Sequence, residues 1–203
     1  ESAEKMYLQN NAKGAIAGFS SYVSKFPNGM HALNANFYLA QLYYADKLEN
    51  NAIPHYEYVV SKSRNEYTEQ SLARLTEIYI KKKDFAKAIP ALKRLETEAD
   101  FPQNVTFAQS NLMKAYYEQE EYNNAVVYAE KVLANAKVDD RIKSDAQMIV
   151  ARSAIKTNDE AKAKAAYAKL QTIAKGELAA EAFYYDAYFK NKEGKYADSE
   201  KVI

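Results

Sequence analysis

One pattern recurs along the whole chain at an almost constant interval. A small residue that is expected to begin a helix stands at Ala15, Ala52, Ala88, Ala125, Ala163 and, less typically, Ser199. The successive intervals are 37, 36, 37, 38 and 36 residues. Chance apolar periodicity does not keep register over such a length, whereas a fixed period of roughly 20–50 residues is typical of stacked repeats. We call these six positions the marker residues and expect a repeat protein.

Within each copy, the apolar residues are spaced as they would be on two helices. Leu39 and Tyr43 lie four positions apart, and Ala52 and Tyr56 repeat that spacing after a short polar turn. Residues four apart share one face of an α-helix. A single helix pair buries too little apolar surface to offset its loss of conformational entropy, so stability must come from stacking pair on pair.

This pattern predicts an antiparallel helix pair in every copy. The expected helices span 1–12 and 13–26, 30–46 and 50–63, 67–82 and 85–99, 104–119 and 122–136, 141–156 and 159–174, and a last pair from about 178. We therefore expect an all-α chain of about 12 helices, including partial ones. Residues 1–203 are expected to form a single array of about five repeats and a truncated sixth, as a fragment of a longer chain.

Two prolines test the register of the expected helices. Pro54 and Pro90 each follow a marker residue by two positions. Proline inside a helix costs about 3 kcal/mol. We expect both helices to begin just before their markers, which places the prolines among the first four residues, whose N–H groups have no partner within the helix.

The residues Leu39-Ala-x-x-Tyr43 followed by Ala52-x-x-x-Tyr56 resemble the tetratricopeptide repeat, or TPR. The resemblance implies a right-handed superhelical solenoid of antiparallel helix pairs. It also implies a concave wall, lined by the first helix of each pair, on which extended or helical peptide segments bind. The expected function is accordingly that of a non-enzymatic scaffold for a protein or peptide partner.

The resemblance also indicates which side chains line the concave wall. In TPR proteins they stand at the second, fifth, ninth and twelfth positions of the repeat, and here they combine aromatic with polar groups, as protein interfaces do. The groove candidates are Asn34, Phe37, Gln41, Tyr44, Glu77, Phe107, Lys114, Tyr117, Met148 and Arg152. The alternative is that they are ordinary helix surface. The Lys and Asn clamp of chaperone-tail TPRs is absent from these positions, so chaperone C-termini are not expected partners.

The first third of the chain is similar to a narrower group, the periplasmic TPR proteins of Gram-negative bacteria. These include the TPR coordinator of the Tol-Pal system and the TPR lipoprotein of the outer-membrane barrel-assembly machine. The similar blocks are AIAGFSSYVSKFP at 15–27 and ANFYLAQLYY at 35–44. This similarity implies a bacterial cell-envelope protein that is periplasmic or associated with the outer membrane.

Composition and motifs argue against several other functions. Lys and Arg number 28 against 27 Asp and Glu, so no overall field favours nucleic acid or anionic lipid. No apolar run approaches the ~20 residues that span a bilayer. The chain has no cysteine, its two histidines form no HExxH pair, and its five glycines form no phosphate-binding motif. We expect no catalytic, cofactor or metal site, and no enzymatic activity.

A second reading of the chain stays open. The array could be architectural or self-associating, within a larger protein whose other parts carry an enzymatic activity. A last helix that stops at Val202-Ile203 would leave the preceding core uncovered. Exposed apolar ends of a repeat array favour association, so this reading predicts end-to-end contacts between copies.

Overall fold

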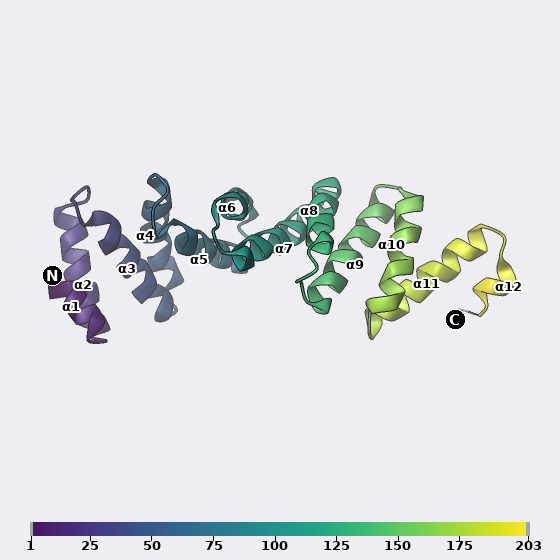
Figure 1. The fold of residues 1–203 in the computed structure, drawn as a ribbon, viewed down its shortest axis with the longest axis horizontal. Coiled ribbons are helices and arrows are strands. Elements are labelled where there is room, and N and C mark those ends of the chain that lie inside the picture. Colours follow the sequence, from purple (N-terminus) through teal and green to yellow (C-terminus); the bar gives the residue numbers. More distant parts are fainter. Residues whose placement is uncertain (1, 202–203) are drawn as a thin grey trace. The chain divides into compact units, whose positions relative to one another are not determined.

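The computed structural model describes residues 2–201, and every regular element within that range is a helix (Figure 1). The helices are α1 (Ser2–Leu8), α2 (Ala12–Lys25), α3 (Ala32–Ala45), α4 (Glu49–Ser61), α5 (Thr68–Lys81), α6 (Phe85–Glu98), α7 (Pro102–Glu118), α8 (Tyr122–Ala134), α9 (Asp140–Lys156), α10 (Glu160–Ile173), α11 (Glu177–Lys192) and α12 (Tyr196–Ser199). Each predicted helix is present, with its ends shifted by at most a few residues. The predicted all-α class is confirmed.

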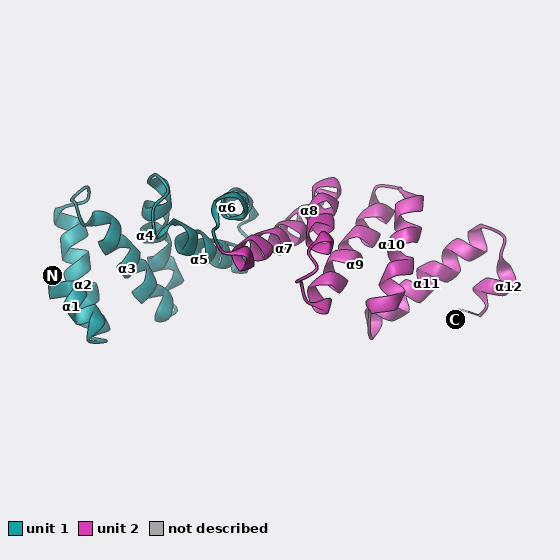
Figure 2. Cartoon of the chain, in the orientation of Figure 1, with its two compact units in different colours: residues 1–100 teal, residues 101–203 magenta. Residues whose placement is uncertain are grey.

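The chain forms two compact units, Glu1–Asp100 and Phe101–Ile203, which we call unit 1 and unit 2 (Figure 2). Within each unit, consecutive helices pack against each other, and in unit 2 α7 also packs against α9. We call the odd-numbered helices A helices and the even-numbered ones B helices. Each A helix and the B helix that follows it form one pair.

All six marker residues are buried. All five marker alanines have no exposed surface, and Ser199 is 7% exposed. The residue four positions after a marker is also buried in unit 1, where Phe19, Tyr56 and Leu92 fill the core. Small and large residues thus alternate on the buried face of each B helix of unit 1, as close packing of interiors requires.

Each turn from an A helix to its B helix contains one residue with a left-handed backbone. It stands five positions before the marker in every pair, at Asn10, Lys47, Lys83, Glu120, Asn158 and Gly194, with φ between 56° and 78°. At Lys47 the cap is a Schellman motif, because the Lys47 N–H donates to the Tyr44 carbonyl and the Leu48 N–H to the Tyr43 carbonyl. This cap ends the A helix and starts the B helix at the same point in each pair.

The expected position of the two prolines was wrong. The cap makes α4 and α6 begin three residues before their markers, at Glu49 and Phe85, so Pro54 and Pro90 are each the sixth residue of a helix. Each proline removes the amide donor that would normally bond to the carbonyl four residues earlier. Both prolines are exposed, so the missing bond lies on the solvent side of the helix.

Candidate functional site

In unit 1, three side chains join the A helices α3 and α5. The Tyr44 hydroxyl donates to Glu77 Oε2 at 2.7 Å, and Arg74 Nη1 donates to the same oxygen at 2.9 Å. The Arg74 guanidinium lies over the Tyr44 ring, 4.7 Å from its centroid. We call Tyr44, Arg74 and Glu77 the Tyr44 cluster. It holds a ring, a cation and an anion together on one surface.

The electrostatics of the Tyr44 cluster follow from these contacts. The hydrogen bond to Glu77, with burial as the second cause, raises the pKa of the Tyr44 hydroxyl. Burial alone would lower the pKa of Arg74, but the hydrogen bond and the charge of Glu77 outweigh it and raise that pKa. Tyr44 therefore stays a neutral donor and Arg74 a cation at physiological pH, and both directions favour the observed geometry.

Gln41 lies one turn before Tyr44 on α3, and a tyrosine of α4 orients its side chain. The Tyr56 hydroxyl of α4 donates to Gln41 Oε1 at 2.5 Å, while the Tyr56 ring is fully buried. Burial raises the pKa of Tyr56. A core tyrosine thus satisfies its hydroxyl and, through it, orients a polar side chain on the A-helix surface.

In unit 2, the A helices are joined by ion pairs. Lys114 Nζ of α7 lies 2.6 Å from Asp145 Oδ2 of α9. Arg152 of α9 grips Glu181 of α11 with two parallel bonds, Nε to Oε1 at 2.9 Å and Nη2 to Oε2 at 2.5 Å. The hydrogen bonds from Arg152 are the main cause that lowers the pKa of Glu181. Such bidentate pairs are geometrically specific, so they define how neighbouring A helices align.

The structure brings several of the predicted groove residues together. Gln41, Tyr44 and Glu77 share one surface in unit 1, and Lys114 and Arg152 lie on A helices of unit 2 with partners on the next A helix. The ring of Tyr117 meets Tyr122 edge to face at 5.7 Å. Phe107 and Met148 are partly buried.

Two predicted residues lie apart from these groups. Phe37 is only 6% exposed and stacks on Tyr67 with 4.3 Å between the ring centroids. Its ring contributes to the packing of unit 1 and leaves little surface for contact with a ligand. Asn34 instead lines a separate pocket of about 480 Å³ between α1, α2 and α3, together with Tyr22 and His31.

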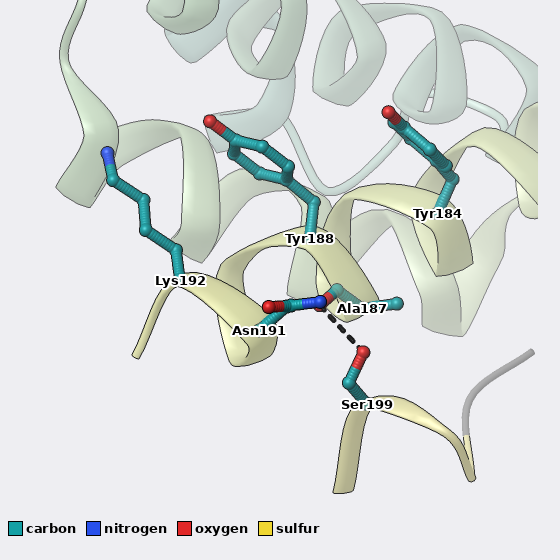
Figure 3. Close-up of a pocket in the computed structure, with 6 residues that line it drawn as sticks. All are labelled: Tyr184, Ala187, Tyr188, Asn191, Lys192 and Ser199. Atoms are coloured by element: carbon teal, nitrogen blue, oxygen red, sulfur yellow. Dashed lines mark hydrogen bonds between the residues drawn. The ribbon is translucent and has the colours of Figure 1, made fainter. Parts of the chain in front are cut away.

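Sequence reasoning missed Arg74, because it stands at the sixth position of its repeat. Its spacing of three residues from Glu77 on the same helix is a signal that could have found it. Sequence reasoning also missed two exposed tyrosines of α11. Tyr184 and Tyr188 are 63% and 46% exposed, and they line a pocket beside Ser199 (Figure 3). Applying the same position rule once more, with Ser199 as marker, selects both.

Within residues 2–201, no group of three or more His, Asp or Glu side chains is placed to hold a metal ion. His55 is instead a packing residue, with Nδ1 2.8 Å from Asn36 Oδ1 and its ring stacked on Tyr43. Over the same described range, no helix combines the length and the apolar character that crossing a membrane requires.

These helix pairs and their joined A-helix surfaces define a helical repeat protein. Comparison with solved structures identifies the type of repeat. YrrB, described as a TPR protein with an unusual peptide-binding site, shares 16% identity at a TM-score of 0.62, covering 89% of this chain and 87% of its own. MamA shares 17% identity at a TM-score of 0.58, and the match covers 97% of this chain and 98% of MamA. PilW is described as a widely conserved type IV pilus biogenesis factor. It shares 13% identity at a TM-score of 0.52, and the match covers 98% of this chain and 86% of PilW.

The chain therefore adopts the TPR fold, as its sequence pattern predicts. Protein-family models and curated proteins give no significant match. At these identities the structural likeness establishes the fold and leaves the ligand to be argued from the side chains themselves.

Proposed function

We propose that the chain is a non-enzymatic scaffold that binds a peptide, or a segment of another protein, on its A-helix surface. The observation that carries this proposal is the Tyr44 cluster. Its side chains are held in place from two helices, yet those of Arg74 and Glu77 remain 38% and 37% exposed. Tyrosine and arginine are the residues on which binding energy most often concentrates, and groups that are already ordered lose less entropy on binding.

The comparisons support the same proposal from a different side. YrrB has the same fold and is described as having a peptide-binding site. We further propose a place in the bacterial cell envelope, in the periplasm or at the outer membrane. The similarity of the first third of the chain to periplasmic TPR proteins supports this location, as does the likeness in fold to a pilus biogenesis factor.

A crosslinking capture from envelope lysate of the source cells tests the binding proposal. The bait is the 203-residue chain, either unaltered or with Tyr44→Ala and Arg74→Ala together. Arg64→Ala is the matched control, because Arg64 pairs with Asp100 at an exposed site of the same unit. We expect one partner to be captured by the unaltered chain and by the control but not by the double variant, and to rebind in purified form with the same preference. Equal capture by all three chains would contradict the proposal.

The second candidate function is that of an architectural or self-associating solenoid within a larger protein, with or without an enzymatic part. It is favoured by large aromatic side chains that are exposed on the last two helices of unit 2. These are Phe183, Tyr184, Tyr188 and Tyr196, with exposed fractions of 44%, 63%, 46% and 65%. In Figure 3 the rings of Tyr184 and Tyr188 extend from the same side of α11. Val202 and Ile203, on which the predicted end-to-end contact depended, lie outside the described residues.

Sedimentation velocity over a hundredfold range of concentration decides this second candidate. Self-association through the aromatic surface predicts a sedimentation coefficient that rises with concentration and ceases to rise in a Tyr184→Ser, Tyr188→Ser variant. A constant monomer value for the unaltered chain would count against it.

A further inference from the structure

We propose that the Tyr44 cluster recognises a carboxamide in the bound segment, which is either an Asn or Gln side chain or a main-chain peptide group. The inference rests on the proposed function and names the chemical group that the site takes. It follows from three features of the cluster: the atoms left without a partner, the balance of charge, and the contrast with a second arginine-glutamate pair in the same chain.

The internal contacts of the cluster use only one atom of each charged group. Glu77 Oε2 accepts from both Tyr44 and Arg74, and Arg74 contributes Nη1 to that contact. Among residues 2–201, Arg74 Nε, Arg74 Nη2 and Glu77 Oε1 have no hydrogen-bond partner. A guanidinium can only donate and a carboxylate can only accept, whereas a carboxamide offers an acceptor oxygen and a donor nitrogen on neighbouring atoms. The unused atoms of the cluster are complementary to those two functions.

The charges of the cluster select against ionic ligands. A carboxylate that approached Arg74 would also meet the negative charge of Glu77, and an ammonium that approached Glu77 would also meet the guanidinium. Juxtaposing like charges disfavours the wrong partner. A neutral amide satisfies both groups and is repelled by neither.

The arginine is held in one orientation. Its guanidinium lies over the Tyr44 ring, 4.7 Å from the ring centroid, and Nη1 lies 2.9 Å from Glu77 Oε2, so contacts within the protein orient it before a ligand arrives. Planar stacking together with a directed fork of donors is the geometry in which arginine recognises planar groups. An amide is planar, so it fits the unused edge of the guanidinium.

The Arg152–Glu181 pair of unit 2 provides an internal control. There both carboxylate oxygens are occupied by Nε and Nη2 of the arginine, and the Tyr167 hydroxyl also donates to Oε1 at 2.9 Å. Glu181 has no oxygen left without a hydrogen bond. We therefore assign this pair the role of a tie between A helices and assign ligand recognition to the Tyr44 cluster.

The experiment is an NMR titration of the full 203-residue chain, observed at the side-chain Nε–Hε resonances of arginine. The probes are the N-acetyl, N′-methylamide derivatives of Gln, Ala, Glu and Lys. We expect the Gln derivative to move the Arg74 resonance saturably, and the Arg152 resonance to stay unchanged. A Gln derivative that binds about threefold to tenfold more tightly than the Ala derivative, the size of one hydrogen bond, identifies a side-chain amide as the ligand group. Equal binding of the two identifies a main-chain amide.

Two charge-altering variants sharpen the test. Glu77→Gln leaves the cluster positive, so its preference should turn to the Glu derivative. Arg74→Gln leaves the cluster negative, so the Glu77 carboxyl carbon resonance should respond most to the Lys derivative. Circular dichroism equal to that of the unaltered chain shows that each variant is folded.

The inference is overturned if the unaltered chain prefers the Glu or the Lys derivative, or if no probe moves the Arg74 resonance. In either case, a partner still captured through Tyr44 and Arg74 would leave the proposed function standing. If the titration and the capture both fail, the carboxamide inference and the proposed function are both overturned.

Discussion

At the scale of single residues, several polar side chains of the helix interfaces are satisfied by partners on the neighbouring helix. Tyr79 of α5 donates its hydroxyl to Glu57 of α4 at 2.6 Å. His55 and Asn36 form a similar link between α4 and α3. Because an unpaired buried polar group costs about 1–3 kcal/mol, each of these links makes the correct pairing of two helices more stable than a shifted one.

The link between His55 and Asn36 predicts a pH dependence. Asn36 Nδ2 donates to the Ala32 carbonyl at 2.8 Å, so Asn36 Oδ1 faces His55 and Nδ1 of that ring must carry the proton. Burial lowers the pKa of His55 below its usual value. The unfolded chain therefore takes up a proton at higher pH than the folded chain does. The stabilisation is complete above the unfolded pKa of about 6.5 and is lost as the pH falls through the folded pKa.

Urea denaturation between pH 7.5 and pH 5 measures this effect. In the unaltered chain, the free energy of unfolding should decrease as the pH is lowered. In His55→Gln this decrease should be smaller. The exposed His31 serves as the control, and His31→Gln should retain the full slope. Identical slopes in all three chains would contradict the assignment to His55.

At the scale of elements, the recurring left-handed residue sets where each helix ends. Five of the six positions carry Asn, Lys or Glu, and only Gly194 is a glycine. A left-handed residue with a side chain costs roughly 1–2 kcal/mol. Five of the turns in this fold therefore hold strain that their hydrogen bonds and the packing around them must offset.

Replacing Lys47 by Gly should therefore stabilise unit 1. Relief of the backbone strain is partly offset by the greater freedom of glycine in the unfolded chain, which leaves a gain of about 0.5–1 kcal/mol. The reciprocal change, Gly194→Ala, should destabilise unit 2 by about 1 kcal/mol. Nothing lies within 4 Å of the added Cβ, so only backbone strain acts there. Thermal unfolding followed by circular dichroism compares the two, and a loss of stability in Lys47→Gly would refute the strain argument.

The helices were predictable because their apolar spacing and marker residues repeat, whereas the caps were not. Lys47 and Lys83 carry no signal for a left-handed backbone, so Pro54 and Pro90 were expected among the first four residues of their helices, although each is the sixth. In the candidate site, Tyr44 and Glu77 followed from the repeat register. The burial of Phe37 did not, because it depends on Tyr67, which lies just before α5 and outside the apolar period.

At the scale of the molecule, both units use the same ties between successive pairs. Lysines at two fixed positions of the repeat reach acidic residues of the preceding pair. These pairs are Lys81 with Glu49 and Lys87 with Glu57 in unit 1, and Lys192 with Glu160 and Lys162 with Glu130 in unit 2. Exposed ion pairs contribute little to stability because solvent and salt screen them. Each pair brings together one positive and one negative charge, in keeping with a chain whose net charge is only +1.

The central claim is that partners bind to the A-helix surface, and site-specific photocrosslinking tests it most directly. A photoreactive residue is placed at Gln70, which is exposed on the A helix α5, or at Ala86, which is exposed on the B helix α6. Each chain is then irradiated in the presence of the captured partner. We predict a crosslinked product from position 70 and none from position 86. A product from position 86 alone, or equal yields from both, would contradict the account.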